Sequence, residues 1–233
     1  MRWPLSKRQY WLGVYTSVAI GVALAIRVGA SDPALGSSAA IVYLHVPAAM
    51  MMYVACAAVF AASAGYLWQR SERWDDVNGA AAEVGALLAS ISLSTGMVWA
   101  RDAWGQWWVW SPRLSFTLAL WALLVGLVVI RRSMRCTPRR ATVSAVVGMV
   151  AFLDVPLVYL SVKLIPDVHP VMPSLTPDMR AVLLYWLLPT GLVCGGLAHE
   201  ALGVARGERT SQGARAAQEA MPAGEGQRTP TCR

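Results

Sequence analysis

Long blocks of apolar residues dominate this sequence and constrain its fold more strongly than any other feature. Hydrophobic residues make up 56% of the 233 residues and charged residues only 14%, whereas charged residues are about a quarter of an ordinary soluble domain. A helix of about 20 apolar residues crosses the roughly 30 Å hydrocarbon layer of a bilayer. The blocks therefore predict an all-α integral membrane protein with six transmembrane helices. The expected helices span residues 9–29, 43–68, 80–100, 114–130, 141–163 and 181–199.

The first apolar block and the polar C-terminal segment each need a separate interpretation. The first block is predicted to be a retained helix, because no small-residue cleavage site follows it and Arg27 interrupts its end. From residue 206 onward the chain is polar, contains Gly and Pro and has no hydrophobic period. We therefore expect a six-helix domain over residues 1–205 and a disordered cytoplasmic tail over residues 206–233.

The distribution of basic residues predicts the orientation. If the N-terminus is cytoplasmic, the inner segments hold fifteen of the 20 lysines and arginines. The positive-inside bias then places both termini in the cytoplasm. This topology and contact with anionic membrane lipid account for the net charge of +7, so the charge does not indicate a nucleic-acid partner. The basic residues left outside are Arg27, Arg101, Arg113, Lys163 and Arg180.

The third expected connection, WARDAWGQWWVWSPR from residue 99, holds five tryptophans in twelve positions. Tryptophan is common at membrane interfaces because its ring is amphipathic, so an interface belt is one interpretation. A belt residue needs no neighbours of its own kind, however. Trp104 and Trp108 would share a helical face, and Trp108 and Trp110 would share a face of an extended segment. Gly105 would allow close approach of backbone or ligand. The cluster favours a flat apolar platform for a ligand.

Two of the three histidines flank this stretch on the same outer side. His45 precedes Pro47 near the expected start of the second helix, and His169 lies in the last outer loop. Each could be an ordinary polar residue at the membrane boundary. Together beside an aromatic wall they favour a large planar metal cofactor, because paired histidines are common axial ligands of haem iron. Arg113 could bind a carboxylate of such a cofactor or anchor the fourth helix at the interface.

One carboxylate lies within an expected helix. Asp154, two residues before Pro156, is a candidate structural or functional intramembrane acid, since such groups are costly in lipid. Asp154 also supports an alternative function, that of a small-solute permease. No phosphate-binding loop, nucleophile elbow or zinc-protease motif occurs in the sequence. Binding and transfer of a cofactor is therefore favoured over enzymatic catalysis.

The stretch STGMVWARDAWGQWWVWSPRLS resembles the tryptophan-rich WWD signature of haem-handling membrane proteins of cytochrome c biogenesis. Within them, YLHVPAAM and VPLVYLSVKLIPDVH are similar to segments of the cytochrome c maturation protein C (CcmC) family. The resemblance covers residues 9–199. It departs at Ser111, where the signature normally ends in aspartate, although Ser111 could still cap a helix beginning at Pro112.

The resemblance implies specific roles. His45 and His169 would be the axial ligands of the iron of non-covalent, transient haem b, and Arg113 matches the arginine after the motif. The platform for haem and for a chaperone would comprise Trp104, Gly105, Trp107, Trp108 and Trp110.

The resemblance also implies a place and partners. The protein would work at the periplasmic face of the bacterial inner membrane, with subunits of an ABC transporter and a small single-helix protein. It would deliver haem to the membrane-anchored periplasmic chaperone CcmE. A haem ligase component that attaches haem to apocytochrome c is the alternative within the superfamily.

Overall fold

The computed structural model describes residues 6–29, 39–134, 137–164 and 175–220, and these residues form six α-helices and no β-strand. Each helix is long and apolar enough to cross a membrane, which confirms the all-α, six-span prediction. The direction of insertion stays a prediction. The helices are α1 (Lys7–Gly29), α2 (Ala39–Gln69), α3 (Glu72–Trp104), α4 (Pro112–Ser133), α5 (Thr137–Leu164) and α6 (Pro177–Ala220).

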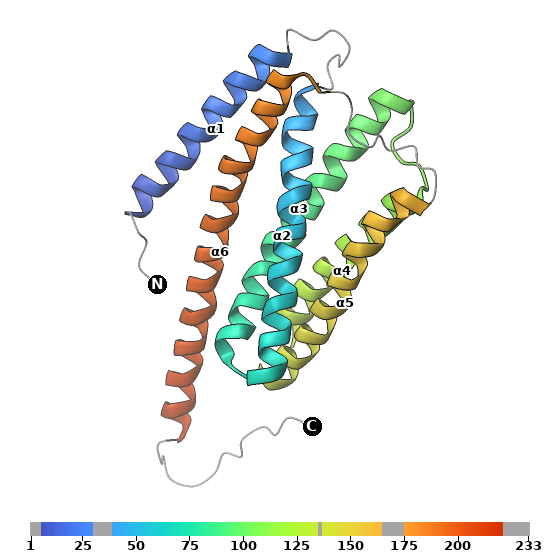
Figure 1. Cartoon of the computed structure of the whole chain (residues 1–233). Coiled ribbons are helices and arrows are strands. Elements are labelled where there is room, and N and C mark those ends of the chain that lie inside the picture. The colour runs from blue at the N-terminus through green and yellow to red at the C-terminus, as the bar shows by residue number, and fades with distance from the viewer. Residues whose placement is uncertain (1–5, 30–38, 135–136, 165–174, 221–233) are drawn as a thin grey trace.

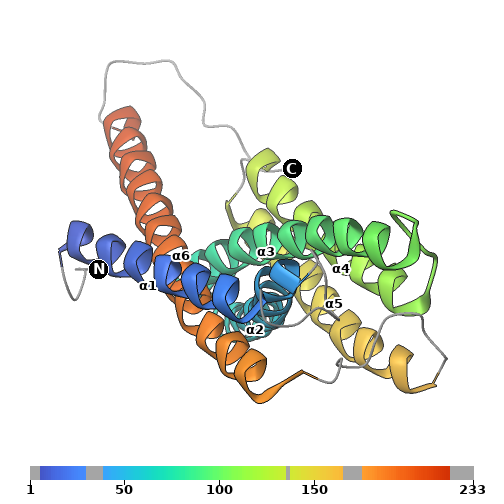
Figure 2. The same cartoon turned by 90° about the horizontal axis from the view of Figure 1, so that it is seen from above.

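Successive helices run in opposite directions, so their connections alternate between two ends of the bundle (Figure 1). The end that carries the α2–α3 and α4–α5 turns is called the basic end below. The other end carries the α3–α4 connection, residues 105–111, and is called the tryptophan end. Helix α2 packs on α3 and α5, and α4 packs on the same two helices, while α1 packs mainly on α6 (Figure 2). The helices α2 to α5 therefore form the main body, and α1 and α6 lie along its side.

All six helices begin earlier than their hydropathy predicts, and α3 differs most. Helix α2 begins at Ala39 instead of residue 43, so His45 lies further inside the helix than predicted. Helix α3 begins at Glu72 instead of residue 80. Its first turn is polar, but Ser71 caps it by accepting a hydrogen bond from the backbone N–H of Arg73, and acidic residues suit the positive end of a helix dipole. Local polar contacts thus extend a helix beyond its apolar block.

Helix α6 continues to Ala220, although residues 206–220 were expected to belong to a disordered tail. The extension lies against the start of α3, where the Arg209 Nη1 atom is 2.9 Å from the Glu72 carboxylate and the guanidinium also contacts Asp76. The tail prediction was wrong for these residues because such contacts are invisible to a composition argument. Residues 221–233 lie outside the described residues, and the domain boundary at residue 205 stays a prediction.

Small residues allow the main-body helices to pack closely. The core between α2, α3, α4 and α5 contains fully buried Met52, Ala89, Leu120 and Ala151. Small side chains at helix contacts favour close approach inside membranes. These packed helices support the segments at the tryptophan end.

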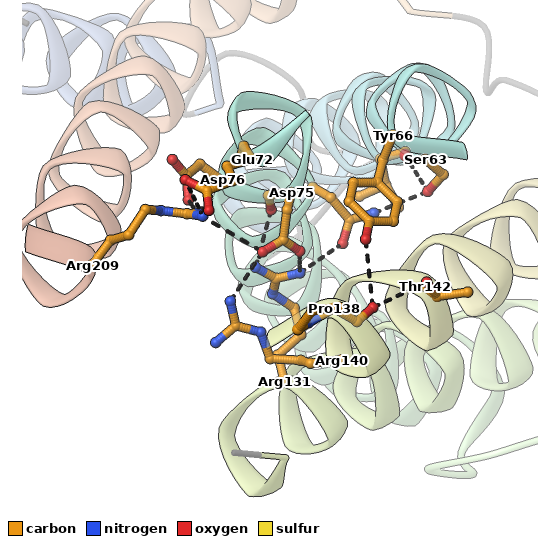
Figure 3. A network of polar contacts seen from close by, with 12 residues as sticks. Ser63, Tyr66, Glu72, Asp75, Asp76, Arg131, Pro138, Arg140, Thr142 and Arg209 are labelled. Atoms are coloured by element: carbon orange, nitrogen blue, oxygen red, sulfur yellow. Dashed lines mark hydrogen bonds and ion pairs between the residues drawn. The ribbon is translucent and has the colours of Figure 1, made fainter. Parts of the chain in front are cut away.

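A buried ionic network joins the helices at the basic end (Figure 3). Asp75 of α3 is 2% exposed, and its two carboxylate oxygens lie 2.5 Å from Arg131 Nη1 of α4 and 3.0 Å from Arg140 Nη2 of α5. Arg131 Nη1 also donates to the Asn78 side-chain oxygen, and Asn78 donates to Ser63 Oγ of α2 at 2.9 Å. Buried charges are tolerated when paired in this way. The network fixes four helices relative to one another.

Candidate functional site

A cavity of about 340 Å³ opens at the tryptophan end, between α2, α3, the start of α4 and the α3–α4 connection. Most of its lining is apolar. Four tryptophans contribute to it, and the polar groups among its lining residues include the His45 imidazole, the Tyr53 phenol and the Arg113 guanidinium. A largely apolar pocket with a few convergent polar groups is typical of ligand sites.

Gly105 ends α3 and turns the chain toward the cavity. Its φ angle of 73° lies in the left-handed region, and its backbone N–H donates to the Arg101 carbonyl at 3.1 Å. A Cβ atom at Gly105 would meet nothing within 4 Å. Glycine is therefore required here by backbone conformation, as at many helix C-termini, and not by space.

Ser111 begins the next helix. Its side-chain oxygen accepts a hydrogen bond from the Leu114 N–H at 3.3 Å, and Pro112 occupies the first helical position. This confirms that Ser111 caps α4. Aspartate is an equally good N-cap, so the replacement of the aspartate expected from the WWD signature leaves this cap in place.

The tryptophans of this segment fall into two groups. Trp104 and Trp108 are partly buried and line the cavity, while Trp107 lines it with 55% of its surface exposed. Trp110 is 76% exposed and is not among the lining residues, although its ring meets the Trp108 ring edge to face at 5.7 Å. Gly105 also lies outside the lining. The predicted platform therefore divides into a cavity wall and an outward-facing aromatic surface.

Trp99, which the sequence did not single out, extends the wall. It lies on the last part of α3 and lines the cavity. Its ring meets the Trp104 ring edge to face, with centroids 5.1 Å apart. Such aromatic pairs hold each other in position. The Nε1 atom of Trp108 is buried and has no hydrogen-bond acceptor among the described residues, so a ligand with an oxygen acceptor could pair with it.

His45 is positioned by α3. Its Nδ1 atom lies 3.1 Å from Thr95 Oγ1. Gly96, the residue after Thr95 in α3, leaves room for the imidazole. A Cβ atom there would be 3.1 Å from His45 Cε1. The ring is therefore packed against α3 by one edge while it lines the cavity.

Arg113 supplies positive charge to the cavity from the first turn of α4. The N-terminus of a helix carries partial positive charge of its own. A guanidinium forms paired hydrogen bonds with carboxylates. This side of the cavity is therefore suited to an acidic group of a bound molecule.

For two predicted residues the structure shows no part in this arrangement. His169 lies outside the described residues, so its role as a ligand stays a prediction. Asp154 of α5 is 8% exposed and is not among the cavity-lining residues. Its Oδ2 atom is buried without a hydrogen-bond partner among the described residues. Its role as an intramembrane acid also stays a prediction.

Sequence reasoning missed the part of α3 that faces His45. Ser92, Thr95, Gly96 and Trp99 follow one another at helical spacing on one face of α3. Three of them line the cavity, and Thr95 contacts His45. A stripe of small and polar residues in an apolar helix was the available signal, because such residues in membrane helices usually face protein.

The fold and the cavity define a multi-pass membrane protein with a largely apolar cavity at one end of its helix bundle. The family model of heme exporter protein C, CcmC, matches residues 4–211. The chain belongs to this family.

Individual relatives agree with the family match. The heme exporter protein C of Escherichia coli K12 is 32% identical over 183 residues, which cover 74% of this chain and 73% of that protein. The protein of the same name from Bradyrhizobium diazoefficiens is 30% identical over 153 residues, 65% of this chain and 58% of that protein. A putative ccmC-like mitochondrial protein of Marchantia polymorpha is 30% identical over 145 residues, 62% of this chain and 61% of that protein.

Proposed function

We propose that this protein handles haem in cytochrome c biogenesis: it binds haem b non-covalently at the tryptophan end and delivers it to a haem chaperone. The observation that carries the proposal is the cavity itself, in which one histidine, an arginine and a wall of tryptophans converge. The names of the relatives describe heme exporters, which agrees with this assignment.

The chemistry of the cavity fits haem as a cargo. The imidazole of His45 would be one ligand of the haem iron, and His169 would be the second. Trp104, Trp107 and Trp108 would provide apolar contact for the porphyrin. Arg113 would bind a propionate through paired hydrogen bonds. Nothing in this arrangement requires a covalent step, so we propose binding and delivery rather than enzymatic attachment.

The proposed setting follows from the charge distribution and the outward-facing tryptophan. Both termini would lie in the cytoplasm, and the tryptophan end would face the periplasm across the bacterial inner membrane. Trp110, which is 76% exposed, would contact the chaperone CcmE. Subunits of an ABC transporter and a small single-helix protein are the further proposed partners.

Replacement of each histidine tests the ligand assignment. The full-length protein is purified in detergent and titrated with haem, and absorption spectra are recorded for His45→Ala, His169→Ala and the control His199→Ala. His199 lies on α6 beside Glu200, whose carboxylate pairs with Lys7 at 2.6 Å on the first turn of α1. We expect altered spectra for the first two variants alone. Unchanged spectra for both would contradict the assignment.

Replacement of the tryptophans separates binding from delivery. We expect Trp108→Ala to weaken haem binding, because this ring lines the cavity. Trp110→Ala should retain haem but transfer it more slowly to purified chaperone. Equal loss of haem in the two variants would contradict the division of the aromatic segment into a wall and a docking surface.

A further inference from the structure

The hydroxyl group of Thr95 has a hydrogen-bonding arrangement that constrains the protonation of His45. Its Oγ1 atom lies 2.7 Å from the Ile91 carbonyl oxygen, 3.1 Å from the Ser92 carbonyl oxygen and 3.1 Å from His45 Nδ1. A hydroxyl group has one proton to donate and two lone pairs that accept. Both carbonyl oxygens can only accept. The hydroxyl proton is therefore directed to the nearest partner, the Ile91 carbonyl, and the oxygen accepts a hydrogen bond from the imidazole.

The direction of this hydrogen bond defines the tautomer of His45. A neutral imidazole carries a single proton, and the nitrogen without it acts as an acceptor or as a metal ligand. If Nδ1 donates to Thr95, the proton is on Nδ1. The nitrogen that carries the lone pair is then Nε2.

The packing of the ring agrees with this assignment. A Cβ atom at Gly96 would lie 3.1 Å from Cε1 and 3.6 Å from Nδ1 of His45, whereas Nε2 is more than 4 Å from that position. The Nδ1–Cε1 edge of the ring therefore lies against α3. The residue as a whole lines the cavity, which leaves the Nε2 side of the ring directed away from α3.

We propose that Thr95 is a positioning residue that holds His45 in the Nδ1-protonated tautomer, so that Nε2 is the atom presented to haem iron. The statement about haem iron rests on the proposed function, since it takes His45 to be an iron ligand. Metal-binding histidines commonly donate their other ring N–H to a fixed acceptor, which sets both the tautomer and the ring orientation. Here a back-bonded threonine hydroxyl provides that acceptor.

Nitrogen-15 NMR of the haem-free protein tests the tautomer directly. The full-length chain contains three histidines, so ¹⁵N-histidine labelling gives three pairs of ring-nitrogen signals, which His169→Ala and His199→Ala assign. At a pH where the rings are neutral, the unprotonated nitrogen of His45 should couple to both ring protons, which identifies it as Nε2. An unprotonated Nδ1 in the wild-type protein would overturn the proposal.

Variants at Thr95 test the cause. Thr95→Val keeps the branched shape and removes the hydroxyl, while Thr95→Ser keeps the hydroxyl. The control is Thr190→Val in α6. The Thr190 hydroxyl donates to the Trp186 carbonyl oxygen, four residues earlier, at 2.7 Å, as the Thr95 hydroxyl does to the Ile91 carbonyl. The Nδ1-protonated population of His45 should fall in Thr95→Val alone. The same tautomer in Thr95→Val and wild type would overturn the proposal, and retention of helix content in each variant shows that the fold is intact.

Haem titration then separates the inference from the proposed function. Thr95→Val should bind haem about tenfold more weakly than wild type, and Thr95→Ser should bind nearly as well, as expected for an outer-shell partner of a metal ligand. If His45→Ala alters the spectrum but Thr95→Val binds normally, the positioning role is wrong and the ligand assignment stands. If His45→Ala leaves the spectrum unchanged, the ligand assignment fails, while the NMR result still decides the tautomer.

Discussion

Gly96 lines the cavity at a point where an added methyl group would crowd His45. A Cβ atom there would lie 3.1 Å from His45 Cε1, which is closer than ordinary van der Waals contact. Gly96→Ala should displace the imidazole and weaken haem binding. Because alanine favours helix by up to about 1 kcal/mol over glycine, the variant need not be less stable. Haem titration and thermal unfolding of the purified protein measure the two effects separately.

Gly126→Ala is the matched control for this prediction. Gly126 lies in α4, and a Cβ atom there would meet nothing within 4 Å. It should raise helix stability by a similar amount and leave haem binding unchanged. If Gly96→Ala and Gly126→Ala bind haem equally well, close packing of His45 on α3 does not matter for the site.

Ser111 makes a second prediction at the scale of one residue. Its side chain caps α4 by accepting from Leu114 N–H. Ser111→Ala should lower stability by about 1 kcal/mol, whereas Ser111→Asp should be nearly neutral because both residues cap well. Thermal unfolding in detergent checks both values. If Ser111→Asp is as unstable as Ser111→Ala, Ser111 does not stabilise the protein by capping α4.

Chemically distinctive residues could be identified from the sequence, and their supports could not. His45, Arg113 and the tryptophans were found because such side chains are rare or clustered, and the structure brings several of them to one cavity. Thr95 and Gly96 gain their significance only from the register of α3 against α2. A single sequence does not define that register.

At the scale of secondary-structure elements, Asp75 links three helices at the basic end. Its carboxylate is 2% exposed and pairs with Arg131 and Arg140. Asp75→Asn should lower stability by about 3 kcal/mol, because removal of one member of a buried ion pair leaves the others uncompensated. The loss should appear as a lower melting temperature of the detergent-purified protein.

An exposed ion pair between α3 and α4 is the control. Arg132 Nη2 lies 3.2 Å from the Glu83 carboxylate, but these side chains are 74% and 45% exposed. Glu83→Gln should therefore change stability by no more than about 0.5 kcal/mol. Similar melting temperatures for Asp75→Asn and Glu83→Gln would contradict the structural role of the buried network.

Hydropathy predicted the existence and order of all six helices but not their limits. Apolar blocks identify the membrane-crossing core of a helix, because that part needs no particular partner. The polar starts and extensions of α3 and α6 depend on pairs such as Glu72 with Arg209, which are far apart in sequence. Tertiary contacts therefore determine where these helices end at the basic end, and a single sequence does not show those contacts.

At the scale of the whole molecule, the two ends of the bundle differ in chemistry. The cavity and its aromatic wall occupy one end. The other end carries the ionic network and the α2–α3 and α4–α5 turns (Figures 1 and 3). A membrane protein with this asymmetry should insert in one direction, with the basic end in the cytoplasm.

Cysteine labelling tests that direction in the full-length chain. Gln106 in the α3–α4 connection and Ser133 at the end of α4 are both exposed and lie at opposite ends of the bundle. In a chain whose four native cysteines are replaced by serine, Gln106→Cys should react with a membrane-impermeant maleimide in spheroplasts. Ser133→Cys should react only after the membrane is permeabilised. The reverse pattern would place the cavity in the cytoplasm and contradict periplasmic delivery of haem, whereas haem binding itself would be unaffected.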